Sequence, residues 1–138
     1  MNRFIPLLLL IGFLTQCRQN EPVPQVNKSF ALSLNDSVSI DLKSPYRGSL
    51  GFKLVRVEDG RCPEGANCLI IGLVRISFIL SLNGDSDAID YYFGIDGNRG
   101  SKPMDGRTFE VVVEDVQPYP RLDNLNSPRK VVFLVRER

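Results

Sequence analysis

The 138-residue sequence contains no histidine and no tryptophan. Without histidine, the chain lacks the usual general base near neutral pH and the commonest ligand of transition metals. A Ser-His-Asp triad is thereby excluded, and the sequence has neither a Gly-x-Ser-x-Gly elbow nor a phosphate-binding glycine loop. We therefore expect a protein that is not an enzyme, with no catalytic residues, no metal and no cofactor. One enzymatic alternative stays open, a carboxylate-based hydrolase, because the 16 Asp and Glu residues could supply a carboxylate pair.

An excess of charge of one sign is also lacking. The chain has 17 Lys and Arg residues against 16 Asp and Glu residues, for a net charge of +1. Arg3 lies in the first segment, so the chain that remains after that segment is removed is formally neutral. Binding to a phosphate backbone needs clustered Lys and Arg, whereas here the two signs are interspersed. We expect no nucleic-acid partner.

No hydrophobic run in the sequence is long enough to span a membrane. The apolar run at residues 4–14 has eleven residues, and a spanning helix needs about 20. This run follows the short positive segment Met1-Asn2-Arg3, which is the pattern of a secretory signal peptide. The sequence therefore predicts export.

Leu14-Thr15-Gln16-Cys17 follows the apolar run and resembles the lipobox of bacterial lipoproteins. The resemblance implies a signal peptide at residues 1–17, lipidation of Cys17 by acyl chains such as palmitate, and the membrane as a partner through this anchor. Arg18 stands where an Asp would retain a lipoprotein in the inner membrane, which by the same resemblance favours the outer membrane. The alternative is ordinary signal cleavage, with Cys17 removed or left as a free thiol.

Residues 18–27 are polar, contain two prolines and show no apolar period. We expect a flexible tether there, because extended proline-rich linkers reach about 3 Å per residue. Ten such residues could hold a domain on the order of 30 Å from the lipid surface. The folded domain is then expected to occupy residues 28–138.

From Lys28 onward, apolar and polar residues alternate, and no segment shows a helical apolar stripe. Alternation of period two predicts strands with one buried face. We expect a bend near Gly72, since glycine inside a strand often marks one. The fold class is predicted to be all-β, an antiparallel β-sandwich or open barrel. About seven strands are expected, at residues 28–34, 38–42, 50–58, 69–82, 88–95, 108–116 and 129–136.

Cys62 and Cys68 are the two cysteines inside the predicted domain. In an exported chain they are expected to form a disulfide, which would close a short loop and stabilise the fold by roughly 2 kcal/mol. A redox pair and a metal site are the alternatives. Redox pairs usually have two intervening residues, and a metal site would need further Cys or His ligands.

The stretch Asp59-Gly60-Arg61-Cys62-Pro63, followed after four residues by Cys68-Leu69-Ile70-Ile71-Gly72, resembles a known signature. It looks like the Asp-Ser-Arg-Cys-Pro-x4-Cys-(Ile/Val)-Trp-Ala-Gly motif of a family of uncharacterised bacterial secreted proteins and lipoproteins. Gly60 stands where Ser is usual and Ile70 where Trp is usual. A later Pro-Tyr-Pro resembles one found in the same family. The resemblance implies export but brings no activity, and its motif residues here are Asp59, Arg61, Pro63, Gly72, Pro118, Tyr119 and Pro120.

Two charged groups allow a functional and a structural interpretation. Arg61 could bind an anionic ligand, but an Arg beside a disulfide loop more often pairs with a neighbouring acid such as Asp59. Acidic residues around the predicted hairpin turn suggest a calcium site. The EF-hand spacing fails there, and a solvated hairpin tip is the preferred interpretation of Asn83, Asp85, Asp87 and Asp90.

Tyr91, Tyr92 and Tyr119, together with Tyr46, are the candidate binding residues. Adjacent strand residues point to opposite faces, so one of Tyr91 and Tyr92 is expected to be exposed. Such tyrosines could line an aromatic patch for a sugar or a peptide. Edge packing and the locking of a turn are the commoner roles.

Together these patterns favour a lipid-anchored protein of the bacterial cell envelope that acts as a non-enzymatic binding module. Its partner would be a protein, a peptide or a glycan. The alternatives are a structural or accessory envelope module with no small ligand, and the hydrolase. An exposed aromatic groove would favour the binding module, a convex surface without a pocket the accessory module, and a buried carboxylate pair in a cleft the hydrolase.

Overall fold

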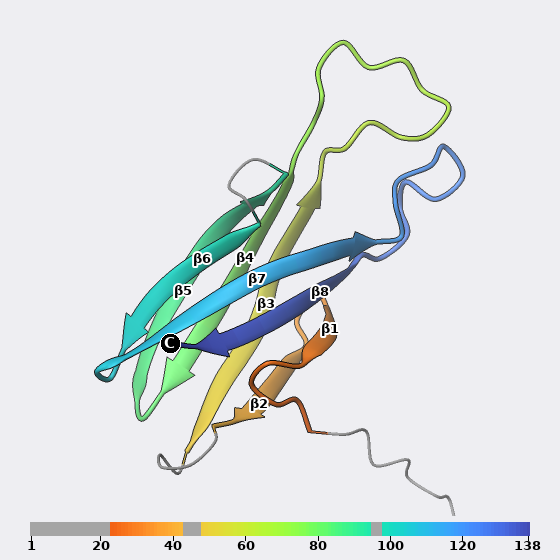
Figure 1. Ribbon diagram of the computed structural model, residues 1–138. Helices are drawn as coiled ribbons and strands as arrows, with labels where there is room; N and C mark the ends of the chain where they lie inside the picture. The colour runs from red at the N-terminus through yellow and green to blue at the C-terminus, as the bar shows by residue number, and fades with distance from the viewer. Residues whose placement is uncertain (1–22, 43–47, 95–97) are drawn as a thin grey trace, which may run out of the picture.

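The computed structural model describes residues 23–42, 48–94 and 98–138. This part of the chain forms two four-stranded antiparallel sheets, with strand orders β1-β8-β7-β6 and β2-β3-β4-β5, and contains no helix (Figure 1). The two sheets do not close into a barrel within these residues, so the predicted antiparallel β-sandwich is confirmed. The strands are β1 (Ser29–Ser33), β2 (Ser37–Asp41), β3 (Ser49–Asp59), β4 (Val74–Leu82), β5 (Asp85–Phe93), β6 (Arg99–Met104), β7 (Arg107–Gln117) and β8 (Lys130–Glu137).

Alternating residues of both sheets meet in a core built around phenylalanines. The ring centroid of Phe52 lies 4.9 Å from that of Phe78 in the same sheet and 4.7 Å from that of Phe133 in the opposite sheet. Aromatic pairs at such distances stabilise a core beyond the area that they bury. In β3 the register against β4 shifts between Leu54 and Arg56, and after this bulge Val57 packs against the core.

The eighth strand, β6, lies between the strands predicted at residues 88–95 and 108–116, so the expected count of about seven strands, with a loop in this interval, is wrong. Within β6 only Met104 is buried, so the strand has no apolar period that the sequence could reveal. It is an edge strand that pairs with β7 alone, and edge strands tolerate the Lys102 and Pro103 that it carries.

The strand predicted at residues 69–82 begins only at Val74. Residues 69–73 belong instead to a long connection between β3 and β4, residues 60–73, which we call the cysteine loop. The bend expected inside a strand at Gly72 therefore falls in this loop. Apolar residues, two of them β-branched, suggested a strand there, although Leu69, Ile70 and Ile71 are exposed to solvent.

The described chain enters at one end of the sandwich, and the cysteine loop projects from the other (Figure 1). Gln25 forms a bridge with Asp41, which pairs with Ser49 at the start of β3. The cysteine loop follows Asp59 at the far end of the same eleven-residue strand. The loop between β7 and β8 lies at the same end as the cysteine loop.

The folded region starts slightly earlier than residue 28. Val26 is buried, and the amide of Asn27 donates a hydrogen bond to the carbonyl oxygen of Val135 at 2.8 Å. Residues 25–27 of the expected tether thus pack against the sandwich. The predicted signal peptide, Cys17 and Tyr46 lie outside the described residues. No helix in the described ranges has the length and hydrophobicity needed to cross a membrane.

Candidate functional site at the cysteine-loop end

The base of the cysteine loop is closed by two glycines. The amide of Gly60 donates a hydrogen bond to the carbonyl oxygen of Leu73 at 2.8 Å. A side chain at Gly72 would overlap the carbonyl oxygen of Gly60, so only glycine allows the two backbone segments to approach this closely. Gly72, where a bend inside a strand was expected, therefore lies at the base of the loop and closes it.

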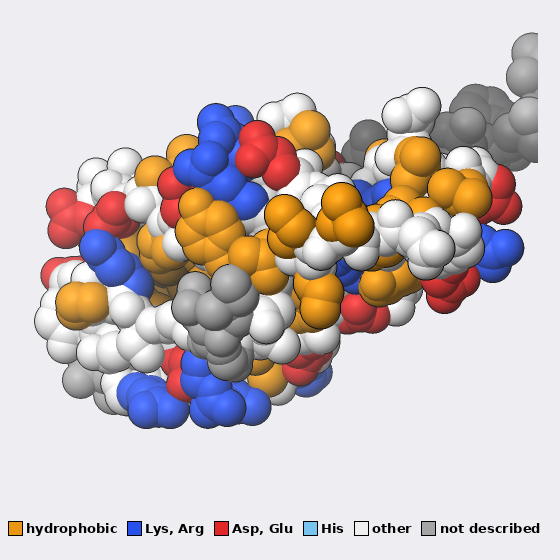
Figure 2. All heavy atoms as spheres, turned by 90° about the horizontal axis from the view of Figure 1, so that it is seen from above, with side chains coloured by type: hydrophobic (Ala, Val, Ile, Leu, Met, Phe, Trp, Pro, Cys, Tyr) orange, Lys and Arg blue, Asp and Glu red, His pale blue; other side chains and the backbone are white. Residues whose placement is uncertain are grey.

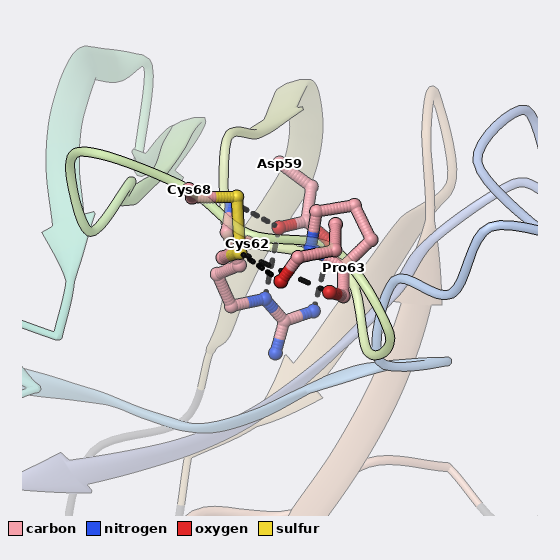
Figure 3. The surroundings of a disulfide bond; sticks show 6 residues. Asp59, Cys62, Pro63 and Cys68 are labelled. Carbon is pink, nitrogen blue, oxygen red and sulfur yellow. Dashed lines mark hydrogen bonds and ion pairs between the residues drawn. A yellow bond between two sulfur atoms is a disulfide. The ribbon is translucent and has the colours of Figure 1, made fainter.

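Cys62 and Cys68 are joined by a disulfide with an S–S distance of 2.17 Å and a Cα–Cα distance of 5.9 Å. Figure 3 shows this bond with Asp59 and Pro63 beside it. It ties the outgoing and returning segments of the loop together. The two thiols are thus both occupied by a structural link, as predicted.

Asp59, Arg61 and Arg129 form an ion-pair cluster beneath the loop, which we call the Asp59 cluster. Arg61 donates hydrogen bonds from Nε to Oδ1 and from Nη2 to Oδ2 of Asp59, both at 2.8 Å. Arg129 Nε donates to the same Oδ2, also at 2.8 Å. The Asp59 side chain is only 6% exposed. Burial alone would raise the pKa of Asp59, but the hydrogen bonds from Arg61 and Arg129 outweigh it and hold this pKa below its ordinary value.

Arg61 also connects the two stretches of the sequence motif. Its Nη2 donates a hydrogen bond to the carbonyl oxygen of Val116 at 2.9 Å, and its guanidinium carbon lies 4.6 Å from the centroid of the Tyr119 ring. The amide of Glu64 donates to the carbonyl oxygen of Pro120 at 3.0 Å. The motif residues near positions 60 and 119 are thus in direct contact.

Pro63, Pro118 and Pro120 shape the two loops around these contacts. Pro63 accepts a hydrogen bond from the amide of Ala66 at 3.1 Å, which forms a turn inside the disulfide loop. The peptide bond between Gln117 and Pro118 is cis, and Pro120 is buried. The structural interpretation of Arg61, pairing with Asp59, is present in the structure, and the contacts described here also hold the cysteine loop and the β7–β8 loop together.

The outer part of the cysteine loop carries three consecutive exposed aliphatic residues. Leu69, Ile70 and Ile71 are 103%, 82% and 89% exposed. We call these three residues the apolar tip. Leu122 and Leu125 of the neighbouring β7–β8 loop are also exposed, and Leu122 approaches Gly65 of the cysteine loop. Figure 2, seen from this end of the molecule, shows a group of hydrophobic side chains in the middle of the view.

Of the candidate binding tyrosines that lie within the described residues, one is buried and two are exposed. Tyr91 and Tyr92 point to opposite faces of β5, as expected, and Tyr91 is the buried one, at 6% exposure against 41% for Tyr92. Tyr91 lies between the sheets beside β6, where it lines a cavity of about 310 Å³. Tyr119 lies at the cysteine-loop end against Arg61. Tyr91 therefore contributes to no exposed binding surface.

The acidic residues near the β4–β5 hairpin bond to separate partners. Asp87 pairs with Lys102, and Asp90 with Ser77 and Arg75. Asn83 Nδ2 donates a hydrogen bond to Asp105 Oδ2 at 2.7 Å. Within residues 23–42, 48–94 and 98–138, no group of three or more His, Cys, Asp or Glu side chains is placed to hold a metal ion.

Two ion-pair residues were missed at the sequence level. Arg129 belongs to the Asp59 cluster, but it lies seventy positions along the chain from Asp59. Glu110 is buried on β7 and pairs with Arg138 at 2.8 Å and with Arg136 at 3.5 Å. The sequence offered one signal for the Glu110 ion pairs. Glu110 is a single acid between two apolar strand residues, Phe109 and Val111.

Comparisons with protein-family models, with curated proteins and with solved structures find no match for this chain.

Proposed function

We propose that this protein is a lipid-anchored, non-enzymatic binding module of the bacterial cell envelope, and that its partner is a protein. The observation that carries this proposal is the apolar tip, three neighbouring aliphatic side chains that are almost fully exposed to water. Exposed apolar clusters of this kind mark interaction surfaces, because water contact with so much apolar area is unfavourable. In an accessory module without a partner, these side chains would stay exposed to water.

The ion pairs of the buried carboxylates support the proposal that this protein is not an enzyme. Hydrolysis by a carboxylate pair requires one carboxyl group whose pKa is raised, so that it can donate a proton. Asp59 has its pKa held low by two arginines, which keep it charged. Glu110 forms ion pairs with Arg136 and Arg138. Groups paired in this way act as structural ion pairs.

The positions of the tyrosines favour a protein over a glycan. Sugar sites commonly stack a ring face on exposed aromatic side chains, whereas Tyr91 is buried and the ring of Tyr119, which is 46% exposed, is in contact with the guanidinium of Arg61. The exposed cluster at the cysteine-loop end is aliphatic instead. Aliphatic side chains are accommodated by apolar pockets of proteins.

The anchoring part of the proposal rests on the Leu14-Thr15-Gln16-Cys17 pattern and on the chain entering the domain at the end opposite the apolar tip. Lipidation of Cys17 would attach the protein to a membrane, and Arg18 favours the outer one. Mass spectrometry of the N-terminal peptide should show an acylated Cys17. An unmodified thiol at that position would remove this part of the proposal.

The partner is tested by a crosslinking pulldown from intact cells. We expect the native protein to enrich one partner protein above an unrelated lipoprotein. The Cys17→Ser variant should move from the membrane to the soluble fraction and still bind that partner when the two are mixed. If nothing is enriched above the unrelated lipoprotein, the binding function is refuted.

A further inference from the structure

We infer that the apolar tip, Leu69, Ile70 and Ile71, is the part of this protein that inserts into an apolar groove of its protein partner. The inference rests on the proposed binding function and assigns its contact surface. All three side chains are more than four-fifths exposed, while their chain neighbours on both sides are held to the domain. The tip is therefore the part of the loop that is left for another molecule.

Both ends of the tip are clamped. Cys68, directly before Leu69, is bonded to Cys62, and Gly72, directly after Ile71, packs against the backbone of Gly60. Gly60 in turn donates its amide hydrogen to Leu73. Binding through a segment held in this way loses less conformational entropy than binding through an unconstrained loop. The disulfide and the glycine contact thus preorganise the three side chains.

The charges around the tip favour a protein over a lipid surface. Peripheral membrane segments combine apolar side chains with unpaired Lys and Arg, which attract anionic lipids. Residues 60–73 contain just two charged side chains, Arg61 and Glu64, and Arg61 is paired with Asp59. Glu64 lies 3.9 Å from Arg121, which is 3.4 Å from Asp123. The five charged residues named here, two arginines and three acids, carry no net positive charge.

This arrangement matches the anatomy of a protein interface. An interface of this type has an apolar centre and a polar rim that remains in contact with water. Here Leu122 lies beside Gly65 of the cysteine loop, and Glu64, Arg121 and Asp123 supply the polar groups at the same end. Figure 2 shows hydrophobic and charged side chains side by side on this face.

The place where the chain enters the domain also favours a partner that is not the membrane holding the anchor. The five residues that separate Cys17 from Val23 span at most about 20 Å. Strand β3, with eleven residues, separates the two ends of the sandwich by about 35 Å. A domain that stands on an anchor at Cys17 therefore presents the tip on the side facing away from that membrane.

Photocrosslinking in intact cells tests the inference. Ile70 is replaced by p-benzoylphenylalanine in the full chain, and Ser86, exposed at the opposite end of the sandwich, is replaced in a control protein. We expect position 70 to yield an adduct with the protein found in the pulldown, at least tenfold more abundantly than position 86. The melting temperature of each protein verifies that it is folded.

Three outcomes would overturn the inference. The first is a pulldown partner without an adduct at position 70, which leaves the binding function in place and moves the contact elsewhere. The second is an adduct that contains just a second copy of this chain. The third is co-sedimentation of the Cys17→Ser protein with phosphatidylethanolamine–phosphatidylglycerol vesicles that is lost in a Leu69→Ser/Ile70→Ser/Ile71→Ser variant, which would assign the tip to lipid.

Discussion

Asp59 connects three parts of the chain through one carboxylate. It ends β3, accepts two hydrogen bonds from the side chain of Arg61 at the start of the cysteine loop and one from Arg129 just before β8. Arg129 also donates to the carbonyl oxygens of Asn124 and Ser127 at 3.2 and 2.9 Å. A single acidic residue therefore sets how the two loops at this end of the sandwich sit against each other.

Replacing Asp59 should destabilise the fold. Asp59→Asn leaves two largely buried guanidinium groups without a negative partner, so we expect the free energy of unfolding to fall by about 2 to 4 kcal/mol. Urea denaturation followed by circular dichroism measures this change. The matched control is Asp123→Asn, because Asp123 is 74% exposed and pairs with Arg121 at the surface. Its effect should stay within about 0.5 kcal/mol, and equal losses in both variants would contradict the account.

The contribution of Asp59 should also depend on pH. Its pKa in the folded protein lies below the ordinary value of 3.8, so the unfolded chain binds the proton more readily. The stabilisation is then complete well above pH 3.8 and is lost as the pH falls through the folded pKa. The difference in unfolding free energy between the native protein and Asp59→Asn should therefore narrow below about pH 4. A difference that stays constant from pH 7 to pH 2.5 would show that the carboxylate charge is not the cause.

Gly72 gives a test of the loop closure. In Gly72→Ala the added methyl group collides with the carbonyl oxygen of Gly60, so the Gly60–Leu73 hydrogen bond should weaken. We expect amide hydrogen exchange at Gly60 to become at least tenfold faster. Gly48→Ala is the control, since no heavy atom lies within 4 Å of a methyl group there. Unchanged exchange at Gly60 in Gly72→Ala would refute the close approach.

At the scale of elements, the cysteine loop is a clamped connection and not an extension of β4. The disulfide closes a segment of seven residues, for which chain entropy gives about 2 kcal/mol of stabilisation. Cys62→Ser/Cys68→Ser should therefore lower the free energy of unfolding by about that amount. The reduced native protein should match the double variant in urea denaturation. A double variant as stable as the oxidised native protein would mean that the bond constrains nothing in the unfolded chain.

The sequence allowed seven strands to be predicted because each has a periodic apolar face. It did not reveal β6, since an edge strand with one buried residue has no such period. Residues 69–73 gave the reverse error, because their apolar side chains predicted a strand where the structure has a loop. A hydrophobic pattern indicates that side chains favour removal from water, but it does not tell whether they are covered by the same chain or by another molecule.

In the candidate site, too, some contacts could be predicted from the sequence and others could not. The pairing of Asp59 with Arg61 was predictable because the two residues are close in sequence. The role of Arg129 was not, since it depends on how the β7–β8 loop returns to the end of β3. The contact between Arg61 and Tyr119 likewise arises from tertiary structure, although both residues had been named from the motif.

At the scale of the whole molecule, the sandwich separates the point where the described chain enters from the apolar tip. The chain enters beside Asp41 at one end, and the apolar tip projects beyond Asp59 at the other. The eleven residues of β3 connect these ends through a core of packed phenylalanines. In the proposed function the domain is thus a rigid spacer between a membrane anchor and a protein contact.

The most direct test of this account compares partner recovery by variants of the full chain in the intact-cell pulldown. The Leu69→Ser/Ile70→Ser/Ile71→Ser variant should keep the native melting temperature, because these side chains are almost fully exposed. It should nevertheless recover at least tenfold less partner than the native protein. The control Val23→Ser, which alters an exposed aliphatic residue at the opposite end, should recover the native amount. Equal recovery by the folded triple variant and the native protein would contradict the account.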